Sequence, residues 1–193
     1  FVMLDRSPGP GGAWQFRWPS LTLSTVNGVH DLPGMPFADT LGDEPPESIA
    51  AADAVPRYYR AYEKRFELNV RRPVTVTVVC DREPLFRVEA GDTVVMAEGL
   101  INATGTWEKP FVPHYDGAET FTGRQLHTKD YRTADEFAGK HVVVVGGGIS
   151  AVQLLDEISQ VTTTTWVTRR PPVFRDSQFD HDAGRKAVAM VEE

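Results

Sequence analysis

The stretch that most restricts the fold is HVVVVGGGISAVQLL, which begins at His141. Its four valines, Val142–Val145, leave no polar face, as expected for a parallel strand that is covered on both sides. Three glycines follow, and apolar residues then recur at helical spacing over residues 150–160. The β-branched run over residues 163–168 is typical of a further strand. The sequence therefore predicts a strand–helix–strand unit and an α/β fold.

The turn between this strand and helix has a dinucleotide-binding pattern. Gly146, Gly148 and Ala151 satisfy G-x-G-x-x-A. One glycine permits the tight turn, the next lets the backbone approach a pyrophosphate, and the small third residue lets the helix pack on the strand. The helix, beginning near Ser150, would offer N–H groups and the positive end of its dipole to the phosphates.

The next strand ends in two arginines, Arg169 and Arg170. An acidic residue there would bind a ribose 2′-hydroxyl, whereas arginine suits a 2′-phosphate, so the pattern favours NADP(H) over NAD(H). The alternative is a glycine-rich turn followed by two solvated arginines. A hydrolase nucleophile elbow centred on Ser150 is a weaker alternative, because that motif requires a small residue where Val152 stands.

The opening, FVMLDRSPGPGGAW, looks like the end of a second such unit. Asp5 ends a short apolar strand, where a Rossmann half carries the acidic residue that binds an adenosine ribose. Its glycine turn would lie about 20 residues earlier, before Phe1. We therefore expect a fragment of a longer protein that lacks the first phosphate turn and purifies without bound flavin. The alternative role for Asp5 is to cap the strand.

The remaining elements are assigned from spacing and composition. Residues 48–64 are expected to form a helix interrupted near Pro56, and residues 21–24 a short strand. The period changes to two afterwards, which predicts an antiparallel meander with Gly91-Asp92 as a hairpin turn. Its strands would span residues 74–79, 86–89 and 93–97, and a further strand would span 100–103.

Composition excludes several classes of function. The net charge of −7 argues against nucleic acid as a partner, and no apolar run reaches the roughly 18 residues of a membrane span. Cys80 is the one cysteine, expected to be buried and inert, and its solitude fits a cytoplasmic setting. The DHD string at Asp180–Asp182 is interpreted as a surface turn, so we expect no metal site.

Several short strings together resemble the class B flavin-dependent monooxygenases. Asp5-Arg6 with GGAW (Gly11–Trp14) is similar to the FAD ribose site and the glycine segment near the flavin diphosphate. LPGMPF at residues 32–37 resembles a further stretch of the family. INATGTWEKPFVP, from Ile101, resembles the segment that returns toward FAD and crosses into the NADP domain. FTGRQLHTKDY, from Phe121, fits the family pattern F-x-G-x-x-x-H-x-x-x-Y just before the second dinucleotide site.

The resemblance implies an incomplete Rossmann-like FAD/NAD(P)-binding fold with a three-stranded antiparallel meander. Residues 1–112 would be a partial FAD-binding domain without its first phosphate turn, and 113–193 the linker and the N-terminal part of an NADP-binding domain. The implied cofactors are FAD and NADPH. Their expected contacts are Asp5, Arg6, Gly11, Gly12, Trp14, Val76, Ala103, Thr104, Gly105, Gly146, Gly148, Ser150, Ala151, Arg169 and Arg170.

The implied reaction is reduction of the flavin by NADPH, formation of a flavin C4a-peroxide with O2, and oxygen transfer to a soft nitrogen or sulfur nucleophile. Tyr131 stands where ketone-oxygenating relatives carry Trp, which disfavours that substrate class. Ser24 stands where the animal-type enzymes carry an Asn that holds the flavin adduct, although Asn27 is nearby. A reductase or oxidase without oxygen transfer, or an inactive fragment, therefore stays open. His127 is expected to fix the linker rather than to act in catalysis, and no catalytic residue is assigned.

Overall fold

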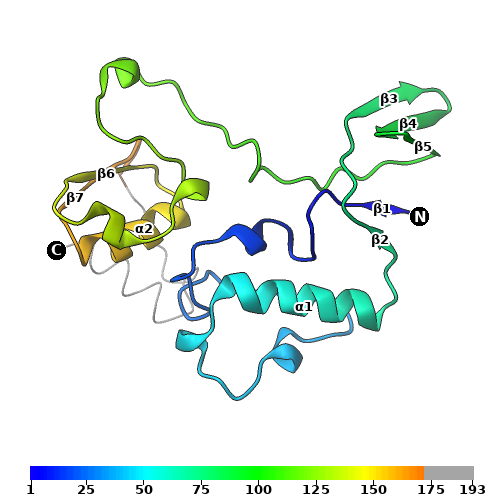
Figure 1. Ribbon diagram of the computed structural model, residues 1–193, viewed down its shortest axis with the longest axis horizontal. Coiled ribbons are helices and arrows are strands. Elements are labelled where there is room, and N and C mark those ends of the chain that lie inside the picture. The colour runs from blue at the N-terminus through cyan, green and yellow to red at the C-terminus, as the bar shows by residue number, and fades with distance from the viewer. Residues whose placement is uncertain (172–193) are drawn as a thin grey trace. The chain divides into compact units, whose positions relative to one another are not determined.

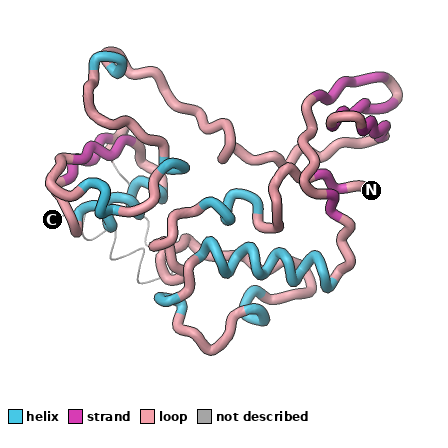
Figure 2. The backbone as a smooth tube through the Cα atoms, in the orientation of Figure 1, coloured by secondary structure: helices cyan, strands magenta, loops and turns pink. Residues whose placement is uncertain are grey.

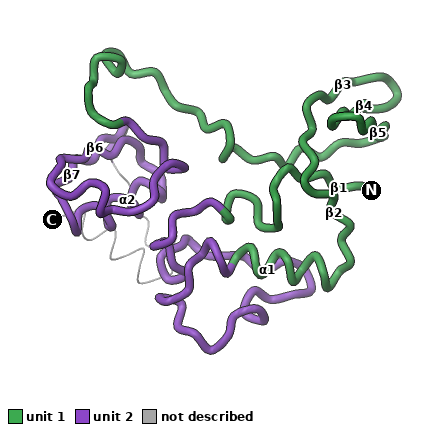
Figure 3. Tube along the Cα trace, viewed as in Figure 1, with its two compact units in different colours: residues 1–15, 55–124 green, residues 16–54, 125–193 purple. Residues whose placement is uncertain are grey.

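The computed structural model describes residues 1–171 of the chain (Figure 1). The chain divides into two compact units (Figure 3). The first unit contains Phe1–Gln15 and Val55–Arg124, and the second contains Phe16–Ala54 and the chain from Gln125 onward. The long helix α1, Ala51–Arg65, begins in the second unit and continues in the first.

Helix α1 forms because its sequence is rich in alanine and has apolar residues at helical spacing. Ala51, Ala54, Val55 and Tyr58 are fully buried along one side of it. An acidic residue lies in the first turn, and the basic Lys64 and Arg65 lie in the last, which complements the helix dipole. Pro56 lies in the second turn, and the helix runs through it without interruption. The predicted break near Pro56 is therefore wrong, because burial of this face outweighs the one backbone bond that a proline cannot make.

The first unit contains two small sheets. Strand β1, Met3–Leu4, pairs in parallel with β2, Val70–Arg71. The meander follows as β3, Val78–Arg82, β4, Leu85–Ala90, and β5, Thr93–Ala97, in that order and antiparallel throughout. Ala90 pairs with Thr93, so Gly91-Asp92 is the two-residue hairpin turn that the sequence predicts. The central strand β4 contains the best buried residue of this sheet, Val88, which is 5% exposed.

The second unit contains the predicted strand–helix–strand crossover. Strand β6, Val142–Val145, pairs in parallel with β7, Thr164–Val167, and α2, Ile149–Ser159, connects them. Val144, Ala151 and Leu155 form a buried cluster with Val142 and Trp166 at its margin. The opposite face carries Val143 and Val145, which are 53% and 51% exposed. Within residues 1–171, the strand is therefore covered on one side, whereas the sequence predicts cover on both.

The rest of the second unit is built from irregular segments and short 3-10 helices (Figure 2). Trp18, Leu21 and Ile49 are buried there. The Leu23 N–H donates to the Ile49 carbonyl at 3.0 Å, and the Ala51 N–H donates to the Leu21 carbonyl at 2.8 Å, which fastens this segment to the start of α1. The chain's 3-10 helices within the described residues are Gly12–Phe16, Phe37–Thr40, Pro46–Ser48, Ala118–Thr120, Thr128–Asp130 and Ala134–Phe137.

Several predicted elements differ from the structure. Residues 21–24 form no strand, since only an isolated bridge between Thr22 and Ala50 is present. Residues 100–103 are also irregular, because Asn102 turns the backbone by accepting from the Thr104 N–H at 3.2 Å. The first meander strand starts at Val78 rather than at residue 74. Cys80 is a free thiol and only partly buried, in contrast to the buried residue expected.

No helix among residues 1–171 is both long and apolar enough to cross a membrane. Within the same residues, no group of three His, Cys, Asp or Glu side chains is placed to hold a metal ion. The DHD string at Asp180–Asp182 lies outside the described residues.

Candidate functional site: two dinucleotide-binding segments

The glycine turn after β6 is held in place by the neighbouring strand β7. The Gly146 N–H donates to the Val167 carbonyl at 2.9 Å, and the Gly146 carbonyl accepts from the Trp166 indole N–H at 2.7 Å. Gly146 has a φ of 131°, which a residue with a side chain rarely adopts. Bonds on both of its backbone groups therefore fix the direction in which the chain leaves the strand.

Gly148 is the N-cap residue of α2, just before the helix that follows this turn. A Cβ built on Gly148 would meet no protein atom within 4 Å, so packing inside the described chain does not require a glycine there. Its carbonyl accepts from the Ala151 N–H at 2.9 Å, which starts α2. The open space beside the backbone, at the positive end of a helix, fits a phosphate group.

The small third position of the motif packs as the sequence predicts. Ala151 is 8% exposed and lies in the buried cluster with Val144 and Leu155. A larger side chain there would push α2 away from β6. Ser150, the neighbouring residue in the first turn, is half-buried.

Arg169 and Arg170 follow β7 after one intervening residue, Thr168, and both are exposed. Val145 pairs with Val167 in the parallel sheet, so the glycine turn and the arginines leave the sheet at the same edge. The Thr168 hydroxyl donates to the Arg170 carbonyl at 2.7 Å, which turns the chain just after the strand. The carboxyl edge of a parallel sheet is where α/β folds bind their ligands.

In the first unit, Asp5 lies at the end of β1, as the ribose assignment requires. One of its carboxylate oxygens accepts from the Ser7 N–H at 2.9 Å, and the other accepts from Arg72 Nε at 2.5 Å. Arg72 also makes two bonds to Glu63 of α1, at 2.8 and 2.7 Å. The bonds to Glu63 are the main reason that the pKa of Arg72 is raised, although burial opposes the rise. Asp5 is therefore oriented by a charged network that the sequence did not indicate.

Arg6 contacts the segment that the resemblance assigns to the return toward FAD. Its guanidinium lies 2.5 Å from a carboxylate oxygen of Glu108, three residues beyond Gly105, and both side chains are about half exposed. Asn102 Oδ1 accepts from the hydroxyl of Thr104 at 2.9 Å, and Ala103, Thr104 and Gly105 are exposed. The structure thus joins Arg6, through one ion pair to Glu108, to the segment that also contains Ala103, Thr104 and Gly105.

The segment Gly11–Trp14 packs against α1. A Cβ on Gly11 would lie 2.8 Å from the Pro56 Cα, and Gly11 has a φ of 98°, so only glycine fits there. The Trp14 N–H donates to the Gly11 carbonyl at 3.0 Å. Gly12, with a φ of 52°, has open space around it. Val76 lies just before β3, with its side chain 38% exposed.

The predicted residues therefore fall into two groups, one on each unit. Asp5, Arg6, Gly11, Gly12, Trp14, Val76, Ala103, Thr104 and Gly105 belong to the first unit, and Gly146, Gly148, Ser150, Ala151, Arg169 and Arg170 belong to the second. The cofactor roles of these residues stay predictions, as does the domain boundary near residue 112.

Sequence reasoning missed two polar clusters. One is the Arg72 and Glu63 pair that holds Asp5. The other is Glu157 of α2, whose carboxylate accepts from Trp18, Ser20 and Tyr131. No local pattern marks either cluster, because their members are 9 to 139 residues apart. His127, expected to fix the linker, accepts from the Lys129 N–H at 3.2 Å and so caps a short 3-10 helix.

Comparison with known proteins gives the family. Residues 25–183 match the family model described as pyridine nucleotide-disulphide oxidoreductase. A flavin-containing monooxygenase from Stenotrophomonas maltophilia has a similar solved structure, with a TM-score of 0.83 and 37% identity, over 98% of this chain and 60% of that chain. A variant of a flavin monooxygenase from the same organism is 41% identical, with a TM-score of 0.79, over 90% of this chain and 52% of that chain.

The curated relatives include an uncharacterized oxidoreductase, CzcO, from Bacillus velezensis, 28% identical over 90% of this chain and 49% of its own length. The chain thus spans about half the length of the curated relatives it matches. A more distant structure of the same fold, OTEMO, was solved in complex with FAD and NADP; it is 22% identical, with a TM-score of 0.59, over 96% of this chain and 39% of that chain. Because the family model covers most of the described chain and the fold agrees, the protein belongs to the pyridine nucleotide-disulphide oxidoreductase family, as a flavin-containing monooxygenase-like member with a partial Rossmann-like fold.

Proposed function

We propose that this chain contributes the NADPH-binding turn and part of the FAD site of a flavin-dependent monooxygenase. The observation that carries the proposal is the open backbone at Gly148, the N-cap residue of α2, which lies at the same sheet edge as Arg169 and Arg170. The helix terminus would bind the pyrophosphate, and the arginines would bind the 2′-phosphate. Asp5, oriented by Arg72, would accept from an adenosine ribose hydroxyl.

The chemistry would be supplied by the bound cofactors, since FAD accepts hydride from NADPH and activates O2. The substrate class we propose is a soft nitrogen or sulfur nucleophile, oxygenated at the expense of NADPH and O2. The relatives named as flavin monooxygenases support this class of reaction. A cytoplasmic setting stays a prediction.

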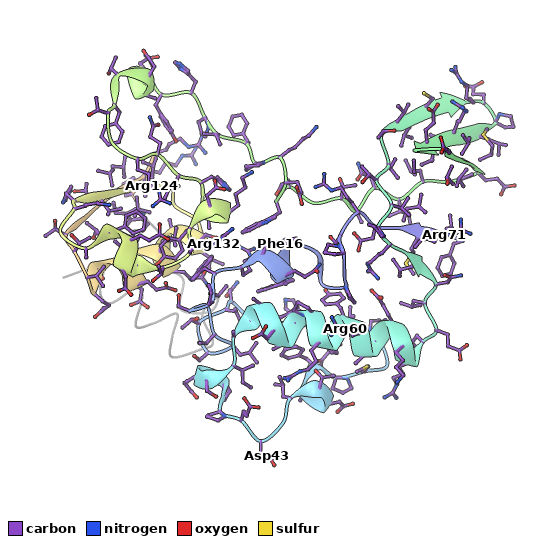
Figure 4. The ribbon with its side chains drawn as sticks, in the orientation of Figure 1. Phe16, Asp43, Arg60, Arg71, Arg124 and Arg132 are labelled. Carbon is purple, nitrogen blue, oxygen red and sulfur yellow. The ribbon has the colours of Figure 1, made fainter. Side chains whose placement is uncertain are left out.

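Titration of the chain with NADPH and with NADH tests the cofactor proposal. We expect tighter binding of NADPH, and replacement of both arginines (Arg169→Ala with Arg170→Ala) should weaken it about tenfold or more, since charged hydrogen bonds contribute about 1.5–3 kcal/mol. NADH affinity should change little. Arg60→Ala, which removes an exposed arginine on α1 (Figure 4), is the matched control. Equal affinity for both nucleotides, or an unchanged affinity in the double variant, would contradict the proposal.

A reductase or oxidase without oxygen transfer is the second candidate. It is favoured by Ser24, whose hydroxyl lies 2.8 Å from that of Thr22, at the position where the resemblance expects an adduct-holding Asn. The two candidates differ in the fate of O2. With FAD, NADPH and a simple thioether or tertiary amine, one oxygenated product per NADPH supports the monooxygenase. Hydrogen peroxide alone supports the second candidate.

A further inference from the structure

The carboxylate of Glu157 is a junction between three parts of the second unit. Oε1 accepts from the Trp18 indole N–H at 2.6 Å. Oε2 accepts from the Ser20 hydroxyl at 2.7 Å and from the Tyr131 hydroxyl at 2.8 Å. The donors come from the N-terminal segment and from the linker, whereas Glu157 lies in the last turns of α2. One side chain thus joins α2 to two segments that are distant in sequence.

Two of the three donors are buried and held by ring packing. Trp18 is 1% exposed and Tyr131 is 3% exposed. Their rings meet edge to face with centroids 5.6 Å apart, and Tyr131 stacks on Phe137 at 6.0 Å with an interplanar angle of 9°. Burial, and then the bond to Glu157, raise the pKa of Tyr131, so its hydroxyl stays protonated and available as a donor. The carboxylate therefore meets two donors, Trp18 and Tyr131, whose positions packing already fixes, while the third, Ser20, is exposed.

A second bond joins the same side of α2 to the same segment. Gln153, four residues before Glu157, donates from Nε2 to the Thr25 carbonyl at 2.8 Å. Residues four apart lie one above the other on a helix. The two side chains fix both the rotation of α2 about its axis and its position along that axis. The N–H groups at the start of α2 move with the helix, because a helix of 11 residues is a stiff element.

A role limited to stability explains this arrangement poorly. Apolar side chains would fill the space beside Trp18 and Tyr131, and replacing a partly buried charge by apolar groups is often neutral or stabilising. A carboxylate offers instead a directional contact that fixes one geometry.

We propose that Glu157 is a positioning residue, which orients α2 so that the turn at Gly146–Gly148 and the first helical N–H groups are aligned for the NADPH pyrophosphate. The inference rests on the proposed function of that turn. Trp18, Ser20 and Tyr131 act through Glu157, and none of the four needs to touch the nucleotide.

The test compares Glu157→Met, which keeps the length of the side chain but cannot accept these bonds, with Glu157→Gln. In Glu157→Gln, the amide oxygen can still accept from Trp18, while the hydroxyls of Ser20 and Tyr131 can turn to accept from the amide nitrogen. Asp156→Asn is the matched control, because it removes a neighbouring carboxylate whose pKa is raised by burial and by Glu157. All variants are titrated with NADPH at a temperature where circular dichroism shows them folded.

We expect Glu157→Met to weaken NADPH binding about tenfold, which corresponds to about 1.4 kcal/mol. Glu157→Gln should restore most of the affinity, and Asp156→Asn should match the unmodified chain. The indole N–H of Trp18, assigned by comparison with Trp18→Phe in a ¹⁵N–¹H spectrum, should shift and lose protection from exchange in Glu157→Met alone. If Glu157 contributed only to stability, Glu157→Met would lower the melting temperature but leave the NADPH affinity of the folded protein unchanged.

A folded Glu157→Met variant with unchanged NADPH affinity would overturn the proposal. If that variant does not fold, Tyr131→Phe decides, since the proposal requires it to weaken NADPH binding about threefold or more by removing a single hydrogen bond. Failure of the proposed function can be told apart from failure of this inference. In the first case the unmodified chain would bind no NADPH, while the Trp18 indole signal would still report the bond to Glu157.

Discussion

At the scale of single residues, the glycine segment near the chain start shows how closely the backbone limits the sequence. Gly11 combines a φ of 98° with the close approach to Pro56 on α1. Gly12 has a φ of 52° but open space around it. A side chain at Gly11 would meet both backbone strain and steric overlap, whereas a side chain at Gly12 would meet backbone strain alone.

Gly11→Ala should destabilise the protein by about 1–2 kcal/mol from backbone strain and by about 1–3 kcal/mol more from overlap with Pro56. Gly12→Ala, the control, should show only the strain. Urea unfolding monitored by circular dichroism gives both values. Equal losses in the two variants would mean that α1 moves away from Gly11 at little cost.

Tyr131 predicts a response to alkaline pH. Its pKa is raised in the folded protein, mainly by burial and then by the bond to Glu157, whereas it is near 10.0 in the unfolded chain. Above that pH the folded state binds more protons than the unfolded state, so stability falls as the pH rises further.

Tyr131→Phe should therefore lower stability at about pH 8 by roughly 1.5–3 kcal/mol, through loss of a hydrogen bond to a charged group. It should also flatten the decline between about pH 10 and pH 11. The midpoint of urea unfolding at each pH measures both effects. A parallel decline in the two proteins would show that Tyr131 ionises freely in the fold.

At the scale of elements, α2 and the strands beside it were predicted well from the sequence, because local pattern determines them. The valine run, the glycines and the helical spacing each select one structure, and all agree. The same holds for the hairpin at Gly91-Asp92.

The predictions failed where distant contacts decide the structure. Residues 21–24 have the composition of a strand. Their backbone, however, bonds to residues 49–51 at the start of α1 rather than to a strand. The sequence places Asp5 at a strand end. No sequence pattern near Asp5 predicts its bond to Arg72, which lies 67 residues away. The parts of the candidate site that local motifs encode could thus be predicted. The polar networks that orient those parts could not be predicted.

The packing of α2 on β6 gives a prediction for this element. Ala151→Leu places three more carbons in the cluster with Val144 and Leu155, and should cost about 1–3 kcal/mol of stability. It should also weaken NADPH binding, because α2 is displaced. Ser159→Leu, at an exposed position on the same helix, should stay within about 0.5 kcal/mol. Thermal unfolding and nucleotide titration of both variants check this, and equal behaviour would show that the cluster tolerates a larger side chain.

At the scale of the whole molecule, the chain consists of two compact units that carry different groups of candidate residues. A ligand stabilises the part of a protein to which it binds, by about 2.7 kcal/mol when its concentration is 100 times its Kd. Multi-unit chains also commonly depart from two-state unfolding.

We therefore expect NADPH to slow hydrogen–deuterium exchange in α2, β6 and β7 of the second unit, and to leave the meander β3–β4–β5 of the first unit unchanged. Peptide-resolved mass spectrometry makes the comparison, with adenosine as a control that lacks phosphates. Equal protection of the meander and of the crossover would show that the two units respond as one.

The bond from Trp166 to the carbonyl of Gly146 has a practical consequence. An indole is an intrinsic fluorophore, and the indole of Trp166 is hydrogen-bonded to Gly146, the first glycine of the turn. Any rearrangement of that turn alters the polarity and hydrogen bonding that the excited ring experiences, so the emission of Trp166, one of the four tryptophans in the chain, reports on the loop once the other three are replaced by Phe. The protein thus carries its own optical probe at the place where its nucleotide is proposed to dock.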